Sequence, residues 1–166
     1  MEEKPTIMGK AAVVEALPEH PAVKAILAWK PEALIDAKFD RNELTLTIAA
    51  EEIRAAAATM QTAGYNFMDD LTAVDWFPSS PRFQVSYHLL SHTFKEYIRL
   101  RVLLDEANPS VASITPVWPS ANYYEREVFD LFGIRFEGHH NMRRIMMPDE
   151  WVGHPLRKDY PVEGYR

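Results

Sequence analysis

The strongest constraint on the fold comes from residues 134–166, because this segment cannot form a hydrophobic core of its own. Its apolar residues follow neither the period of 2 that marks a strand nor the period of 3.6 that marks a helix. Three prolines and three of the chain's six glycines interrupt it. The core must therefore be built by residues 1–133, a length sufficient for one compact domain. We expect residues 134–166 to form an extended strap on the outside of that domain.

The strap nevertheless contains large apolar and aromatic side chains, namely Ile145, Met146, Met147, Trp151 and Tyr160. Disordered tails are usually poor in such residues. A segment of about 30 residues without secondary structure is also uncommon in a compact domain and generally serves a function. We therefore expect the strap to become ordered by lying along the surface of another protein.

An amphipathic helix is predicted immediately before the strap, over residues 119–133. Pro119 and Ser120 are typical of a helix start, and Gly133 is typical of a helix end. One side of this helix is apolar and is expected to face other parts of the protein. That side is formed by Tyr124, Val128, Leu131 and Phe132.

Alternation of apolar and polar residues predicts strands in the middle of the chain. It is clearest in Leu44–Ile48, Phe83–Leu89 and Ile98–Leu104. The last two are expected to be neighbouring antiparallel strands joined through residues 91–96. Weaker extended patterns cover residues 34–39, 67–76 and 111–117.

Helices are predicted around and between these strands, at residues 10–17, 21–29 and 51–63. The resulting order, α-α-β-β-α-β-β-β, indicates an α+β fold with a mostly antiparallel sheet and helices packed on one face, plus the extended C-terminal strap. We expect three parts: an α+β body at residues 1–118, the amphipathic helix at 119–133 and the strap at 134–166.

Charge and composition argue against several classes of function. The net charge is −6, and residues 139–166 contribute about +1, from five Lys and Arg against four Asp and Glu, so the rest carries about −7. An acidic body argues against nucleic-acid binding and against docking on anionic lipid. The absence of cysteine excludes disulfides, thiolate nucleophiles, thiolate zinc sites and cysteine-bound iron–sulfur clusters. No apolar run approaches the roughly 20 residues of a membrane helix.

The carboxylates of the amphipathic helix are the first candidates for chemistry. Glu127 and Asp130 are three residues apart and share a helix face, whereas Glu125 lies elsewhere. Paired carboxylates can serve acid–base catalysis or metal binding. Arg126 and Asp130 are four apart and can form an ion pair. We favour structural or interface ion pairs over catalysis for this group.

The histidines are weaker candidates for a metal site. His88 and His92 have the spacing of a helical metal pair, but His88 lies in a predicted strand, where that spacing separates the two rings. His139, His140 and His154 are not accompanied by cysteine, and the carboxylates around them are scattered. We therefore expect no metal site, and we interpret these histidines as hydrogen-bonding residues of loops.

Paired basic residues in the strap have a more specific interpretation. Arg143 and Arg144 form one pair, and Arg157 and Lys158, next to Asp159, form another. Such residues can form charge-assisted hydrogen bonds with the carboxylates of a partner protein. The chain also lacks a glycine-rich nucleotide-binding loop and a nucleophile elbow. The sequence thus favours protein binding over catalysis.

Taken together, these residues resemble one known family, that of the 30 kDa subunit (the C subunit) of respiratory complex I, the proton-pumping NADH:quinone oxidoreductase. The resemblance is dense over residues 117–161, and in the body it is limited to the strand pattern with Asp75-Trp76 before the strand pair. Two positions depart from the family's common residues: His140 replaces a proline, and Met142 replaces a leucine. The motifs that carry the resemblance are Glu125–Ile134, Gly138-His139, Arg143-Arg144-Ile145, Pro148–Trp151 and Gly153–Pro161.

The resemblance implies a non-catalytic structural subunit of the peripheral arm, which supports electron transfer from NADH to quinone. It implies that this chain holds no cofactor and no metal, because FMN and the iron–sulfur clusters belong to other subunits. It implies packing against the D subunit of the complex, which forms the quinone site, and near the B subunit, which bears an iron–sulfur cluster. It also implies membrane association only through the complex, at the cytoplasmic face of the bacterial inner membrane.

The resemblance further implies roles for particular residues, all at the subunit interface and none of them catalytic. The helix contributes anchors of the helix and strap, and the strap contributes contacts with partner subunits. The expected anchors are Glu125, Arg126, Glu127 and Asp130, and the expected partner contacts are Arg143, Arg144, Trp151, Arg157 and Lys158.

Three other functions remain open from the sequence. The chain could be the equivalent subunit of a membrane-bound hydrogenase or of a complex fed by another electron donor. It could be a free-standing hydrolase that gathers Glu127, Asp130 and a histidine in one pocket. It could also be an adaptor whose tail folds on an unrelated partner.

Overall fold

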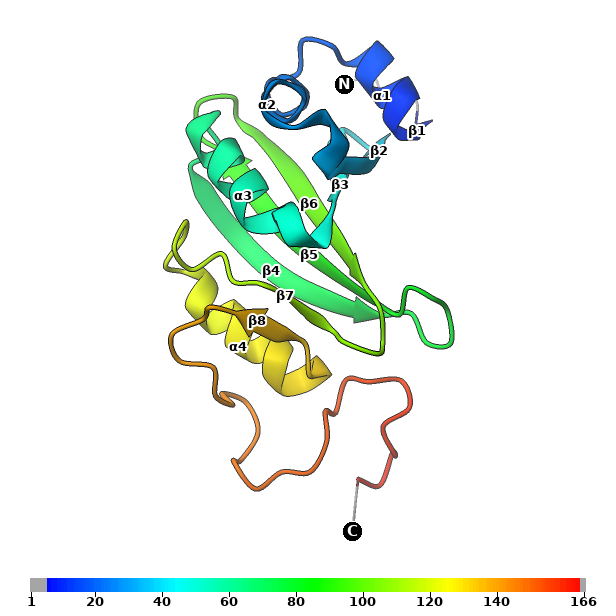
Figure 1. The fold of residues 1–166 in the computed structure, drawn as a ribbon, viewed down its shortest axis with the longest axis vertical. Coiled ribbons are helices and arrows are strands. Elements are labelled where there is room, and N and C mark those ends of the chain that lie inside the picture. The colour runs from blue at the N-terminus through cyan, green and yellow to red at the C-terminus, as the bar shows by residue number, and fades with distance from the viewer. Residues whose placement is uncertain (1–5, 165–166) are drawn as a thin grey trace.

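The computed structural model describes residues 6–164 and shows a mixed six-stranded sheet with helices against it (Figure 1). The strand order is β1-β2-β3-β6-β5-β4, and every neighbouring pair is antiparallel except β3 and β6, which are parallel. The α+β fold expected from the sequence is thereby confirmed. The strands are β1 (Ile7–Met8), β2 (Leu34–Asp40), β3 (Glu43–Ile48), β4 (Phe67–Asp75), β5 (Phe83–Ser91) and β6 (Glu96–Leu104).

Two of the hairpins have short turns that help to fix the register of the sheet. Asp40 pairs with Glu43 across the β2–β3 turn, whose two central residues, Arg41 and Asn42, have φ angles of 51° and 63°. Such left-handed pairs match the twist of a tight hairpin. Ser91 pairs with Glu96 across the β5–β6 turn, as the sequence predicted for these two strands.

The parallel pairing of β3 with β6 results from the path of the chain between them. After β3 come the short 3-10 helix η2 (Ala50–Glu52), the helix α3 (Ile53–Thr62) and the hairpin β4–β5. Because β6 then returns between β5 and β3, the β2–β3 hairpin and the antiparallel strands β4, β5 and β6 join into one continuous sheet. Alternation alone could not predict this order, since it fixes the face of each residue and not its neighbouring strand.

The core lies on one face of this sheet. Each buried strand presents alternate apolar side chains to it, as Leu44, Leu46 and Ile48 of β3 do. Buried residues of all four α-helices in the described part of the chain belong to the same cluster, so these helices cover one face. Fully burying one such aliphatic side chain contributes about 1.5–3 kcal/mol to folding. The helices are α1 (Lys10–Ala16), α2 (Pro21–Trp29), α3 and α4 (Ala121–Phe132), with a 3-10 turn η1 (Pro31–Ala33) before β2.

The C-terminal third begins with a second, smaller sheet. The strand β7 (Ser110–Ala112) pairs in parallel with β8 (Arg135–Glu137), which lies at the start of the segment expected as the strap. Helix α4 connects them and lies beside β4 (Figure 1). Beyond β8 the chain runs to residue 164 without a further helix or strand among the described residues. No helix within residues 6–164 is long and apolar enough to cross a membrane.

Candidate protein-interaction site

Helix α4 ends in a geometry that brings the strap back onto it. Gly133 follows the helix with a φ of 74°, a left-handed conformation that favours glycine. A Cβ atom at this position would lie 2.6–2.7 Å from the side chains of His154 and Arg157. The glycine therefore serves both as the helix end and as the space into which the strap packs.

Asp130 on α4 is the main attachment point of the strap. Its carboxylate is buried, and Oδ2 accepts hydrogen bonds from the backbone amides of residues 145, 146 and 147, at 2.9, 2.8 and 2.8 Å. Oδ1 accepts a hydrogen bond from Arg144 at 2.6 Å. Burial alone would raise the pKa of Asp130, but these donors outweigh it and hold the pKa below its ordinary value.

The two arginines of this region bind carbonyl groups of the strap. Arg126 donates to the backbone oxygens of Arg143 and Arg144, at 3.1 and 3.0 Å. Arg144 donates to those of Trp151 and Gly153, both at 3.0 Å. The ion pair that the helical spacing allowed between Arg126 and Asp130 is not the one formed, because Asp130 pairs with Arg144 of the strap instead.

The next part of the strap satisfies the last carbonyl groups of α4. The amide of Leu156 donates to the oxygen of Leu131 at 3.0 Å, and Arg157 Nε donates to that of Phe132 at 2.6 Å. His154 Nδ1 lies 2.9 Å from the oxygen of Asp130. Because the final carbonyls of a helix have no partner within the helix, these contacts supply the partners that water would otherwise supply.

A buried ion cluster fastens the end of the strap to the sheet. Arg82, which precedes β5, is 2% exposed and donates to Asp75 at the end of β4, at 3.0 and 2.8 Å. It also pairs with Asp159 of the strap at 2.5 Å and with Glu106. The amide of Lys158 donates to Asp75 Oδ2 at 2.9 Å. We call these contacts, together with those of Asp130 and Arg144, the strap junction.

The titration of this cluster follows from its geometry. Burial would raise the pKa of Asp75, but hydrogen bonds from Arg82 and two backbone amides lower it to about 2. Arg82 likewise lowers the pKa of Asp159. Sequence reasoning noted Asp75 only for its place before the strand pair and missed Arg82 as its partner. No local signal could have found the contact of Arg82 with Asp159, because these residues lie 77 positions apart in the chain.

Glu125 attaches α4 to the segment of the body that follows β7. Its carboxylate is fully buried and accepts from Ser113 Oγ at 2.6 Å and from the amide of Ile114 at 2.7 Å. His139 Nε2 lies 4.0 Å away. Burial raises the pKa of Glu125 to about 7 despite these two hydrogen bonds. The side chain thus joins the helix to the segment after β7.

The nine residues predicted at an interface fall into two groups. Glu125, Arg126 and Asp130 are buried and Arg144 and Arg157 half-buried, and all five bind other parts of the same chain. The sequence led us to expect order imposed by another protein, yet in the structure these contacts hold the strap to its own domain. Contact with other subunits stays a prediction for all nine residues. The exposed group comprises Glu127, Arg143, Trp151 and Lys158.

The exposed side of the strap includes large apolar side chains, among them Val152 and Leu156, which the sequence analysis did not name. Met146 and Val152 are each 62% exposed, and Leu156 is 49% exposed. Together with Ile145 and Trp151 they form the exposed strip of the strap. Exposed apolar groups concentrated in one segment indicate a protein-binding surface.

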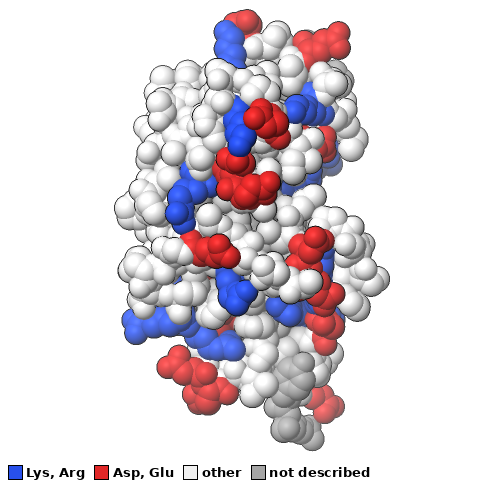
Figure 2. Space-filling model, viewed as in Figure 1, with Lys and Arg blue, Asp and Glu red and all other residues white. Residues whose placement is uncertain are grey.

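The carboxylate of Asp130 and the rings of the neighbouring histidines are engaged in contacts within the chain. The two oxygens of Asp130 accept four hydrogen bonds, so this carboxylate is not available as a base. His139 and His140 stack on each other with ring centroids 5.0 Å apart. No group of three or more His, Asp or Glu within residues 6–164 could hold a metal ion. On the face shown in Figure 2, acidic and basic side chains are interspersed, as suits protein partners.

Comparison with known families gives one match that covers most of the chain. Residues 46–166 match the family described as respiratory-chain NADH dehydrogenase, 30 kDa subunit. The matched range begins within β3 and includes β4, β5, β6, α4 and the strap.

Individual relatives agree with this match. The chain is 47% identical over 133 residues to the C subunit of an NADH-quinone oxidoreductase from Citrifermentans bemidjiense, covering 80% of this chain and 83% of that protein. A trypsin-resistant fragment of Nqo5 is similar in structure, with a TM-score of 0.57 and 34% identity over 60% of this chain and 82% of the fragment. A chain of an archaeal membrane-bound sulfane sulfur reductase gives a TM-score of 0.73 and 28% identity, covering 84% of each chain.

Proposed function

The chain belongs to the family of the 30 kDa subunit of respiratory-chain NADH dehydrogenase, and from that premise we propose that it is a non-catalytic structural subunit. It assembles in the peripheral arm of an NADH:quinone oxidoreductase and supports electron transfer from NADH to quinone. The named relatives of this family are subunits of NADH-quinone oxidoreductases. The observation that carries the proposal is the strap, which is fastened to its own domain and exposes several large apolar side chains.

The strap supports assembly through its two sides. On the inner side, charged residues cross-link the strap to α4 and to the sheet, as Asp130 and Arg82 do. On the outer side lies the exposed strip, with Met146 and Val152 at its most exposed points. A surface that is already in place when the partner arrives loses little conformational entropy on binding. We propose that the exposed strip contacts the quinone-site and cluster-bearing subunits (D and B), with Arg143 and Lys158 at the rim.

The chain itself holds no cofactor in this proposal. Iron–sulfur clusters are bound by cysteine thiolates, or in some centres by cysteine with histidine, and the chain contains no cysteine. FMN and the iron–sulfur clusters then belong to other subunits of the complex. The protein reaches the membrane through the complex alone, at the cytoplasmic face of the bacterial inner membrane.

Affinity capture from gently solubilised native membranes, with mass spectrometry of the associated chains, tests this function. We expect recovery of the quinone-site and cluster-bearing subunits together with the NADH-oxidising ones. A chain that comes only from the soluble fraction without partners would contradict the assembly role.

One second function is favoured by a specific observation. The similarity to a chain of the sulfane sulfur reductase extends over 84% of this sequence. The same type of protein therefore also fits a related respiratory complex fed by another electron donor. In the capture experiment, hydrogenase or other donor subunits in place of the NADH-oxidising ones would assign the chain to such a complex.

A further inference from the structure

The face of the sheet opposite the core, which we call the open face, has more acidic than basic side chains. The basic residues within the described strands of this face are Lys38, Arg99 and Arg101. Each of them already pairs with an acidic side chain of the same face. Two acidic residues of β4, Asp69 and Asp70, lie on this side without such a basic partner. The three pairs are Lys38–Asp40, Arg99–Glu43 and Arg101–Asp36.

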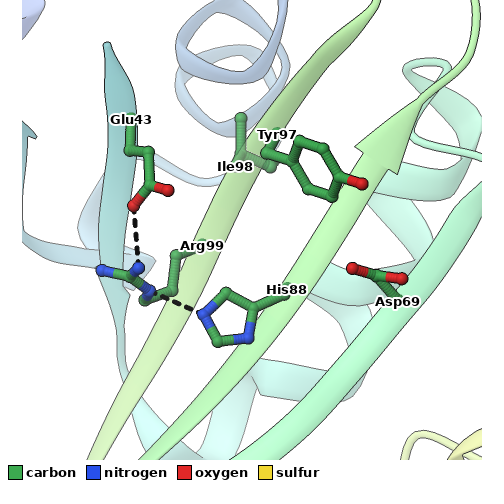
Figure 3. Close-up of a pocket in the computed structure, with 6 residues that line it drawn as sticks. All are labelled: Glu43, Asp69, His88, Tyr97, Ile98 and Arg99. Atoms are coloured by element: carbon green, nitrogen blue, oxygen red, sulfur yellow. Dashed lines mark hydrogen bonds and ion pairs between the residues drawn. The ribbon is translucent and has the colours of Figure 1, made fainter. Parts of the chain in front are cut away.

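A pocket of about 250 Å³ lies beside Asp69 (Figure 3). It extends across four strands, since its lining comes from β3, β6, β5 and β4. Its volume falls below the roughly 300–1,000 Å³ of sites that hold a whole cofactor or drug-sized molecule. It has room for one side chain of another protein. The lining residues are Glu43, Asp69, His88, Tyr97, Ile98 and Arg99.

Hydrogen bonding keeps the histidine of this pocket uncharged. Arg99 Nε donates to His88 Nε2 at 2.9 Å, so that nitrogen must carry a lone pair. Burial and the nearby Arg99 guanidinium both lower the pKa of His88. Arg99 is itself held by Glu43 at 2.8 Å. His88 therefore adds no positive charge that could neutralise the carboxylates.

Asp69 is the carboxylate that remains available. The register of β4 and β5 shifts between Met68 and Asp70, and such a bulge redirects the extra residue. The exposed Asp69 carboxylate has no hydrogen bond or ion pair with any residue of the described range 6–164. Asp70 lies only near the neutral His88, at 3.6 Å. The pocket and its rim thus carry an excess of negative charge.

Tyr97 gives the pocket an aromatic wall. Its ring is about half exposed, and in Figure 3 it projects toward the same space as His88 and Asp69. A guanidinium or ammonium group gains energy from an aromatic face as well as from a carboxylate. An arginine meets both demands because its planar group can stack and donate at the same time.

We propose that this pocket receives an arginine or lysine side chain of another protein of the complex, which packs on the open face of the sheet. This docking surface is separate from the strap, so the chain would contact neighbours on two sides. The inference rests on the assembly role proposed above and adds to it the chemistry of one contact. The occupant is a basic side chain of a protein, chosen by the charge imbalance and the size of the pocket.

Site-specific photo-crosslinking in the purified complex tests the proposal. A benzophenone amino acid replaces Phe67, which lies on β4 at the rim of the open face and is 45% exposed. After irradiation, mass spectrometry maps the linked peptide. We expect a segment of a different protein of the complex that contains an arginine or lysine. A link only to a second copy of this chain, or to a segment without a basic residue, would overturn the proposal.

Charge variants in the same complex supply a second readout. We expect Asp69→Asn to increase loss of the linked protein in a salt wash by at least about threefold, since exposed or partly buried pairs change affinity by such factors. Asp105→Asn is the control, because Asp105 is also an exposed aspartate and lies just after β6. Asp69→Arg combined with an acidic replacement of the linked basic residue should restore retention.

Equal loss from the Asp69→Asn and Asp105→Asn complexes, or no rescue by the charge exchange, would also overturn the proposal. These outcomes are distinct from failure of the proposed function. In that case the chain would not co-purify with NADH-oxidising or quinone-site subunits at all, and no complex would be obtained to crosslink.

Discussion

The sheet core and the strap junction hold their parts together by different interactions. In the core, strands β3, β5 and β6 bury alternate apolar side chains against helices. In the strap junction, an extended segment is held by carboxylates and guanidinium groups that bind backbone amides and carbonyls. A chain region that lacks periodic apolar residues can therefore still adopt one conformation, provided that buried charged groups satisfy its backbone.

The difference also sets what each region offers to a partner. The core uses its apolar side chains internally, so little of them remains exposed. The strap uses polar groups internally, which leaves Met146, Val152 and Leu156 on the outside. This inversion explains why Arg144 and Arg157, two of the five strap residues expected to contact a partner, are largely engaged within the chain.

The largest expected effect comes from a substitution in the sheet core. Leu100 lies in the middle of β6 and is fully buried, at 0% exposure. Leu100→Ala should lower the free energy of unfolding by about 2–5 kcal/mol, because it removes buried methyl groups and leaves a cavity. Urea denaturation followed by circular dichroism measures this loss. Leu103→Ala on the open face is the control and should change little, since Leu103 is 37% exposed.

The next effect tests the strap junction. Asp130→Asn removes the charge that three amides and Arg144 share, and should lower the free energy of local strap opening by about 1.5–3 kcal/mol. Hydrogen exchange of the amides of residues 145–147 reports it directly. The control is Glu127→Gln on the exposed face of the same helix. Unchanged protection in Asp130→Asn would show that the hydrogen bonds of Asp130 do not hold the strap.

A pH series separates Glu125 from the acidic groups of the strap junction. The pKa of Glu125 is raised to about 7 from an ordinary value of 4.5, so within this window the folded state binds more protons than the unfolded state. Its contribution to stability therefore falls as pH rises through the window, by a few kcal/mol at most. Thermal melting across pH 5–8 measures the slope. Glu125→Gln should flatten it.

Asp75 should change the stability with pH in the opposite direction to Glu125. Its pKa is lowered to about 2, so its contribution is complete above about pH 4 and is lost as pH falls toward 2. Protection of the strap amides against hydrogen exchange should therefore be lost in acid. The destabilisation caused by ionising Glu125 is absent there, because its carboxyl group is protonated at low pH. A single monotonic pH dependence across the whole range would contradict this pair of assignments.

The smallest expected effect concerns the exposed end of the ion cluster. Asp159 is 46% exposed at its side chain, so Asp159→Asn should cost only about 0.2–1 kcal/mol. Limited proteolysis after Lys158 should become slightly faster as the strap opens more often. Asp149→Asn, an exposed aspartate of the strap, is the matched control. Equal cleavage rates in both variants would show that Asp159 does not help to hold the strap.

Much of the local structure was predictable from sequence. The predicted strand at Leu44–Ile48 lies within β3, the predicted pair at 83–89 and 98–104 forms the β5–β6 hairpin, and helix α4 ends at Phe132 before Gly133. The family was also predictable, because residues 125–161 carry several motifs at fixed spacing. The alternation of apolar and polar residues, the residues typical of helix ends and the spacing of motifs are all properties of residues close together in the sequence.

The tertiary structure decided the rest. Only the chain path places β6 in parallel beside β3, makes Arg144 rather than Arg126 the partner of Asp130, and brings Asp159 to Arg82. Each of these outcomes depends on which distant segments meet, and a local sequence pattern does not specify such contacts. The sequence by itself determined most of the helices and strands and the family, although it did not predict β1 or β8, whereas long-range contacts determined what fastens the strap and which of its side chains remain exposed.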